Sequence, residues 1–309
     1  MSAARVGNNP AFVSGSGRSI ESLAEDEVLE RLSTSGAILF RGFDTDADRF
    51  RTFAERFTFS FLTSPFGDRK NVDGPLQTVT VGQSGLDLHF EFGNSPLRPD
   101  LLWFHCETPP GAGRGGATTL ADGVSIYGEL SEPTRDLLGS RNVKYSNYLP
   151  KAAFDYFLAN EGFRAILGEE PSEAVDRLDH VTVTHEPDDM VRFDVVVPFV
   201  RETASGKTAM FQNIFASAYA KPSDSSAKVA FSMDMTWEDG ERISEELVGE
   251  LTSAANRCLK GIRWNAGDFL LIDNNRFMHG RKATNDPDRS IFLLSSFSHG
   301  AVSEFALDA

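Results

Sequence analysis

Hydrophobic residues recur at helical spacing in four parts of the chain. The predicted helices cover residues 20–35, 46–57, 131–140 and 243–260. In the first, Leu23, Val28 and Leu32 share one face, and Gly36 follows at the position where glycine commonly ends a helix. Ser131 is a predicted N-cap, because its side-chain oxygen can accept from a free backbone N–H of the first turn.

Short apolar or alternating runs predict strands between and after these helices. They cover residues 37–43, 76–82, 100–107, 268–273 and 290–298. The run DLLWFHCE at 100–107 is apolar without alternation, which indicates a strand buried on both faces. Many short strands with few helices predict a mainly β protein with helices (α+β). We expect a jelly roll, or double-stranded β-helix, with flanking helices and a lid insertion.

The domain organisation is expected to be simple. No repeat or linker divides the chain, so we predict a single domain over residues 1–309. Residues 1–18 are rich in Gly, Ser and Asn and are expected to form a mobile arm. Residues 131–240 mix helical patterns with strand-like pieces such as DVVVPFV, and we predict that they form an insertion or lid.

Charge and cysteine content narrow the class of partner. The net charge of −15 argues against nucleic acid, whose phosphates need clustered basic residues, and against anionic membranes. Cys106 and Cys258 lack the spacing of a disulfide framework or a thiolate metal site, and we expect two buried thiols. No signal sequence or transmembrane run is present, so a cytoplasmic location is expected. The sequence does not determine the oligomeric state.

The segment DLHFEFGNSP, residues 87–96, carries the main chemical signal. His89 and Glu91 are two positions apart, so in a strand they project from the same face and can reach one ion. A third ligand from elsewhere would complete a 2-His-1-carboxylate site, and His279 is the candidate. Solvated strand residues or a local ion pair are the alternatives. Burial of Glu91 among apolar neighbours is costly without a compensating cation, which favours a metal.

Three motifs then resemble a known family. The motifs LHFEFGNSPLRPDLLWFHC, GGATTLADG and WNAGDFLLIDNNRFMHGRKATNDPDRSIFLL, in this order, resemble the taurine dioxygenase family of iron(II) and 2-oxoglutarate dependent oxygenases, and especially its clavaminate synthase-like branch. The resemblance implies Fe(II) as cofactor and 2-oxoglutarate and O2 as cosubstrates. It implies His89, Glu91 and His279 as iron ligands, and a turn-stabilising role for Asp273 and Asn274.

The same resemblance implies the residues that bind 2-oxoglutarate. Arg289 matches the arginine that grips the distal carboxylate, a role that suits the bidentate geometry of guanidinium. Thr118 matches a threonine that donates to the same carboxylate, with Thr119 as the alternative if the register differs by one. Arg281 is similar to an arginine near the cosubstrate or the iron.

Substrate contacts rest on proximity in sequence. Phe92, Asn94, Ser95 and Gln83 lie near the first two ligands and are predicted to line the substrate pocket. Leu293 stands where relatives of the family that bind anionic substrates place an arginine, which argues against a sulfonate such as taurine. By analogy with the branch, the substrate is an amino acid derivative or another small molecule of specialised metabolism.

The resulting hypothesis is oxidation of an unactivated C–H bond of this small molecule. Hydroxylation, desaturation or epoxidation would accompany release of succinate and CO2. One alternative is a zinc-dependent hydrolase, which would leave Arg289 and Thr118 without a role and would need a general base near the metal. A non-catalytic jelly-roll binding protein is the other.

Overall fold

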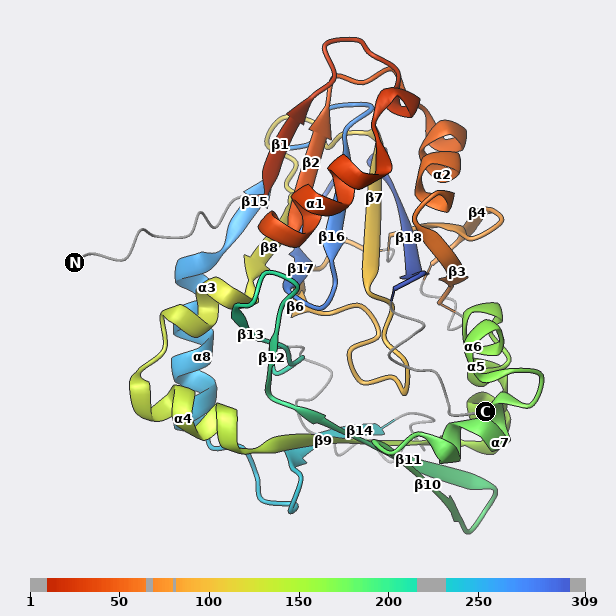
Figure 1. Ribbon diagram of the computed structural model, residues 1–309, viewed down its shortest axis with the longest axis vertical. Helices are drawn as coiled ribbons and strands as arrows, with labels where there is room; N and C mark the ends of the chain where they lie inside the picture. The colour runs from red at the N-terminus through yellow and green to blue at the C-terminus, as the bar shows by residue number, and fades with distance from the viewer. Residues whose placement is uncertain (1–9, 65–68, 80–81, 216–231, 301–309) are drawn as a thin grey trace.

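Strands dominate the computed structural model, which describes residues 10–64, 69–79, 82–215 and 232–300 (Figure 1). An eight-stranded sheet runs through the upper part of the view in Figure 1, in the order β1-β2-β16-β7-β18-β5-β4, with β3 also paired to β18. Its strands are β1 (Ala11–Ser14), β2 (Ala37–Arg41), β3 (Thr58–Leu62), β4 (Asn71–Asp73), β5 (Leu76–Thr78), β7 (Leu101–Thr108), β16 (Phe269–Asp273) and β18 (Ser290–Ser298). All pairings in this sheet are antiparallel except β1 with β2.

A second, four-stranded sheet packs against the first and carries part of the candidate site. Its order is β15-β8-β17-β6. The strands are β6 (Leu86–His89), β8 (Thr118–Asp122), β15 (Lys260–Ile262) and β17 (Phe277–Arg281). Leu102 and Phe104 of β7 share one apolar core with Leu120 of β8 and Phe277 of β17, so the two sheets form a sandwich. The sheets are not closed into a barrel, and the predicted mainly β, jelly-roll class is confirmed.

Alternation along the central strands separates two cores. In β16, Leu270 and Ile272 face the sandwich, whereas Phe269 and Leu271 belong to the core beneath the helices. A 3-10 turn, η1 (Ile20–Ser22), and the helices α1 (Glu25–Ser35) and α2 (Ala47–Glu55) cover this second face. Strand β7 is buried on both faces, as its uninterrupted apolar run predicts.

Caps confirm two predicted helix ends, at Gly36 and at Ser131, whereas the helix predicted from residue 20 begins only at Glu25, after the separate turn η1. α1 ends at Gly36, whose φ of 72° lies in the left-handed region and whose N–H donates to the carbonyl of Leu32. In α4 (Glu132–Ser140), the Ser131 side chain accepts from the N–H of Thr134. In α8 (Glu245–Cys258), Ser244 accepts in the same way from Leu247.

The beginning of the chain differs from the expectation of an arm. Ala11–Ser14, predicted to be mobile, forms β1, which pairs in parallel with β2. Pairing with a buried strand satisfies the backbone hydrogen-bonding groups of this segment, and the composition of residues 1–18 does not reveal that partner. Residues 1–9 lie outside the described residues.

The predicted insertion contains a sheet of its own. Its order is β10-β11-β9-β14, and it forms the lower layer in the view of Figure 1, with a separate β12–β13 pair above it. The helix α3 (Gly123–Gly128) precedes this region, whose elements are α4, β9 (Asn142–Pro150), α5 (Lys151–Leu158), α6 (Glu161–Leu167), α7 (Pro171–Ala174), η2 (Val175–Arg177), β10 (Val181–Glu186), β11 (Met190–Pro198), β12 (Val200–Glu202), β13 (Thr208–Met210) and β14 (Ser232–Trp237). Its core is continuous with Phe90, next to the candidate ligands. Its action as a lid stays a prediction.

Two further expectations concern exposure. Cys106 and Cys258 are buried free thiols, as predicted.

Within the described part of the chain, no helix combines the length and apolar character that crossing a membrane requires.

His105 of β7 provides a stability prediction. Its ring stacks between Phe50 and Phe292, and burial lowers its pKa from 6.5 to about 4. In the unfolded chain His105 binds a proton below about pH 6.5, whereas in the folded protein it does so only below about pH 4. The folded protein therefore loses stability as the pH falls from 6.5 to 4. Relative to His105→Phe, the wild type is expected to lose about 3 kcal/mol between pH 7 and pH 4. Denaturant titrations of both proteins at the two pH values measure this difference, and equal losses would contradict it.

Candidate metal centre

The first two candidate ligands do not share a strand. β6 ends at His89, and Glu91 lies in the turn that follows. The prediction that both side chains project from one strand face is therefore wrong. The next residue, Phe92, has a positive φ of 53°, and the chain turns here immediately after Glu91.

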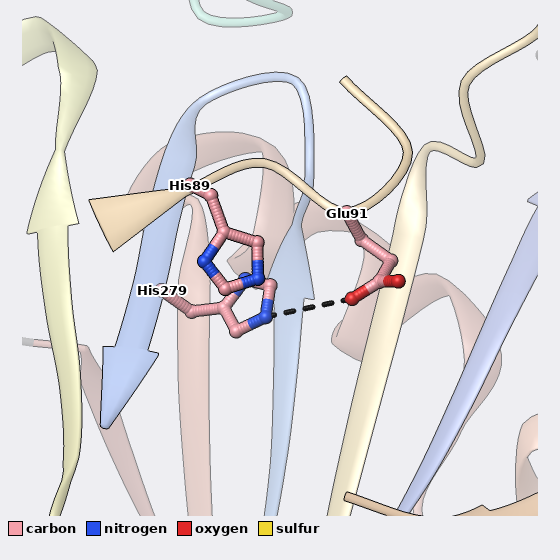
Figure 2. Close-up of side chains that lie close together, drawn as sticks. All are labelled: His89, Glu91 and His279. Carbon is pink, nitrogen blue, oxygen red and sulfur yellow. Dashed lines mark ion pairs between the residues drawn. The ribbon is translucent and has the colours of Figure 1, made fainter. Parts of the chain in front are cut away.

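The three candidate ligands nevertheless converge. One ligand atom from each of His89, Glu91 and His279 can be chosen so that all lie within 4.8 Å of one another. The rings of the two histidines are 4.2 Å apart between centroids, and His279 Nε2 is 3.6 Å from Glu91 Oε2 (Figure 2). His279 is directly opposite His89 in the β17–β6 pairing, so the sheet itself brings the two imidazoles together.

A hydrogen bond of His89 and the lowered pKa of His279 both suit metal binding. His89 Nδ1 is 2.7 Å from the carbonyl oxygen of Asp87; donation to that oxygen leaves the lone pair on Nε2, an arrangement common for metal-bound histidines. Burial holds the pKa of His279 well below its ordinary value, with smaller contributions from His89 and Arg69. Two imidazoles and a carboxylate form the donor set of ferrous 2-His-1-carboxylate sites, so the residues fit the ion.

Arg69 is a member of the site that the sequence did not reveal. One of its terminal nitrogens, NH2, lies 2.9 Å from each carboxylate oxygen of Glu91, and both side chains are nearly buried. This guanidinium compensates the charge of Glu91, so burial of the carboxylate does not by itself require a metal ion, contrary to our sequence argument. No local pattern around Arg69 marks it, because it lies 22 residues before Glu91 on a segment outside the site motifs.

A cavity extends from the two histidines toward Arg289. Its lining includes Thr118, Arg281, Arg289 and Leu293. The Nε atom of Arg289 is buried without a hydrogen-bond partner among the described residues. Burial, and next the proximity of Arg281, lower the pKa of Arg289 to about 10. An anion bound here would accept a hydrogen bond from Arg289 Nε and would stabilise the positive charge of the guanidinium.

The register of the threonines is clear from the structure. Thr118 lines the cavity with Arg289, whereas Thr119 faces a different cavity beside α8. Trp264 Nε1 donates to Thr118 Oγ1 over 3.0 Å. The hydroxyl proton of Thr118 is therefore directed away from Trp264 and is available to a ligand.

Arg281 has a structural task in addition to lining the cavity. Its NH2 group donates to the backbone carbonyls of Gly82 and Ser84, which fixes the loop before β6. Gln83 in this loop is exposed; its carbonyl accepts from Thr284, and it lines a neighbouring cavity that also includes Arg281 and Arg289.

The other predicted substrate contacts are not on the cavity between the histidines and Arg289. Phe92 stacks on Phe157 of α5, and Asn94 donates to Asn147 of β9. Ser95 donates to the carbonyl of Leu97 and lines a separate cavity toward β11. Phe92 and Asn94 therefore join the insertion to the ligand loop.

Comparisons with known proteins agree with this geometry. A clavaminate synthase-like protein of Arabidopsis thaliana is 24% identical over 279 residues, which cover 85% of this chain and 82% of the relative. Among solved structures, AAD-2 in complex with Mn(II) and N-oxalylglycine has a TM-score of 0.59 at 14% identity, with 93% of this chain and 94% of AAD-2 covered. The PvcB protein of Pseudomonas aeruginosa has a TM-score of 0.54 at 16% identity, over 94% of this chain and 87% of PvcB. These structural likenesses show the fold.

The family model described as taurine catabolism dioxygenase TauD, TfdA family, matches residues 9–294, which is nearly the whole chain. This match favours an oxygenase over the two alternatives left by the sequence, a zinc hydrolase and a non-catalytic binding protein. The chain belongs to the TauD/TfdA family of dioxygenases, which use iron and 2-oxoglutarate together with O2.

Proposed function

We propose that this enzyme binds Fe(II) through His89, Glu91 and His279 and couples decarboxylation of 2-oxoglutarate to oxidation of a C–H bond in a small molecule. The single observation that carries the proposal is the convergence of these three side chains beside a cavity that also contains Arg289 and Thr118. A facial triad of this kind leaves positions open for a chelating cosubstrate and O2.

The far end of the cavity suits the distal carboxylate of 2-oxoglutarate. Arg289 offers a buried guanidinium whose Nε has no partner among the described residues, and Thr118 offers a hydroxyl proton. Charge-assisted hydrogen bonds of this kind are worth about 1.5 to 3 kcal/mol each. We propose that these two residues fix the orientation of the cosubstrate, while Arg281 holds the adjoining loop.

The iron, when bound, supplies the activation of O2 that the chain cannot provide. The residues of the chain hold the ligands, orient the cosubstrate and keep water away from the reacting atoms. Phe104 and Leu293 provide an apolar wall on the cavity. Phe104 also packs edge-on against the ring of His279, at 5.4 Å between centroids, and so fixes its orientation.

We propose an amino acid derivative or a related intermediate of specialised metabolism as substrate, with hydroxylation, desaturation or epoxidation as the outcome. The support is the clavaminate synthase-like relative and Leu293 on the cavity wall, an apolar residue at the position where relatives of the family that bind anionic substrates place an arginine. A cytoplasmic location and the absence of nucleic-acid and membrane partners stay predictions from the sequence, as does the single-domain organisation.

The test uses pure protein incubated anaerobically with Fe(II), 2-oxoglutarate and a panel of amino acid derivatives, followed by air. We expect succinate to form, and one panel member to gain one oxygen or to lose two hydrogens in the mass spectrum. Zn(II) in place of Fe(II) is the control and should give no succinate. Turnover with Zn(II), or product without consumption of 2-oxoglutarate, would refute the proposal.

Arg289→Ala is expected to raise the KM for 2-oxoglutarate about 100-fold with a smaller change in kcat. Removal of the guanidinium takes away two charge-assisted hydrogen bonds to a carboxylate that stays bound throughout the reaction. Initial rates of succinate formation against 2-oxoglutarate concentration give both constants.

A pair of threonine variants is the control for this assignment. Thr118→Val should also raise the KM for 2-oxoglutarate, whereas Thr119→Val, on the neighbouring residue that faces another cavity, should not. Equal effects of the two substitutions would argue against the proposed orientation.

A further inference from the structure

Two asparagines hold the chain segment that carries Glu91. Asn213 Oδ1 accepts from the N–H of Phe90 over 2.6 Å, and Asn213 Nδ2 donates to the carbonyl of the same residue over 3.1 Å. Asn274 Oδ1 accepts from the N–H of Glu91 over 2.9 Å, and its Nδ2 donates to the carbonyl of Glu91 over 3.0 Å. Both asparagines are essentially buried.

This arrangement replaces a strand partner. In an antiparallel ladder, a hydrogen-bonded pair of residues exchanges two bonds, one N–H to C=O in each direction. β6 ends at His89, and beyond it the amides of Asn213 and Asn274 provide the same two-bond exchange for Phe90 and Glu91. A side-chain amide can do this because it carries both a donor and an acceptor, which a carboxylate or an alkyl group lacks.

Asn213 is itself anchored in the insertion. Its backbone N–H donates to the hydroxyl of Tyr145, a fully buried residue of β9, over 2.9 Å. Gly93 leaves room for the amide, because a Cβ at Gly93 would lie only 2.2 Å from Asn213 Nδ2. The polar pair Gln212 and Asn213 in an otherwise apolar run is the signal in the sequence that could have revealed this buried role.

We propose that Asn213 is a positioning residue for the metal site, acting through the backbone of Phe90 to hold Glu91 ready for the ion before the ion binds. The proposal rests on the ligand set of the proposed function. Without this clamp, residues 90–91 are free to leave the conformation that directs the carboxylate toward the histidines. Metal binding would then have to order residues 90–91, and the loss of conformational entropy would weaken the affinity for the ion.

The test measures Mn(II) affinity by the EPR signal of the free ion, which needs no turnover. Asn213→Ala and Gly93→Ala are both expected to weaken binding about 10- to 100-fold, the usual effect of losing a residue that orients a ligand. The added methyl group of Gly93→Ala displaces the side-chain amide of Asn213. This variant therefore disturbs the same hydrogen bonds without removing a hydrogen-bonding side chain.

The matched control is Asn147→Ala. Asn147 is another fully buried asparagine of the insertion, and it holds the same loop at Asn94, three residues beyond Glu91. Its loss should leave Mn(II) affinity within about twofold of the wild type, since it does not touch the ligand segment. Equal weakening by Asn147→Ala and Asn213→Ala would overturn the proposal, because general loop stability would then explain both.

Two further measurements separate the possible failures. If His279→Ala leaves Mn(II) binding unchanged, the ligand set itself is wrong; if it abolishes binding while Asn213→Ala matches the control, only the present inference fails. Amide hydrogen exchange of the wild type remains informative even if the variants do not fold. The amides of Phe90 and Glu91 should be protected in metal-free protein, and protection that arises only with Mn(II) would overturn preorganisation.

Discussion

Replacement of His279 by alanine is expected to abolish 2-oxoglutarate decarboxylation while the protein stays folded. His279 supplies one of only two imidazoles in the candidate donor set, and an alanine at β17 leaves His89 and Glu91 to bind the ion alone. The loss should exceed the roughly 100-fold effect of changes to residues that only orient ligands. Succinate formation and Fe(II) binding by the purified variant measure it, and circular dichroism shows whether the fold persists.

The control for this variant is a histidine remote from the site. His185 lies exposed on β10 in the insertion, so His185→Ala should retain wild-type turnover. Normal turnover by His279→Ala would remove this residue from the ligand set. Loss of activity by His185→Ala to the same degree would indicate a nonspecific effect of histidine replacement.

The second large effect is expected on stability. Arg276 and Asp122 form a bidentate ion pair with both nitrogen–oxygen distances at 2.9 Å, and the two side chains are almost wholly buried. The pair joins the end of β8 to the turn before β17, the two strands that carry Thr118 and His279. Arg276→Met leaves a buried carboxylate without its cation, and we expect the free energy of unfolding to fall by about 3 to 5 kcal/mol.

An exposed ion pair provides the comparison. Arg257 Nε is 2.8 Å from Glu129 Oε2, and about half of each side chain is exposed to water. Because solvent screens such a pair, Arg257→Met should cost less than about 1 kcal/mol. Denaturant unfolding of both variants gives the two values. If Arg276→Met were as stable as Arg257→Met, the buried pair would not stabilise the link between the two strands.

Local patterns predicted a large part of the fold. The helical faces of α1 and α2, the N-cap Ser131 and the doubly buried β7 all follow from residues within one element. These features depend on spacing and on short-range hydrogen bonds, which the sequence displays directly. The pairing of β1 with β2 depends on a partner 27 residues away, and composition suggested an arm instead.

The candidate site divides in the same way. The motifs identified His89, Glu91 and His279 by residue type and order, and the structure brings these side chains together. Arg69 and Asn213 were missed because their roles arise from contacts across 22 and 123 residues of chain. Phe92, Asn94 and Ser95 are close to the ligands in sequence, yet the turn at Phe92 directs them toward the insertion.

The sequence by itself indicated the class of fold, through the periodicity of its apolar residues, and its motifs resembled the family and supplied a candidate donor set. Only the tertiary structure decided how Glu91 is held: its carboxylate by Arg69 and its backbone by Asn274, with Asn213 on the preceding residue. The physical reason is that β6 ends at His89, so the segment must find its hydrogen-bond partners in distant parts of the chain.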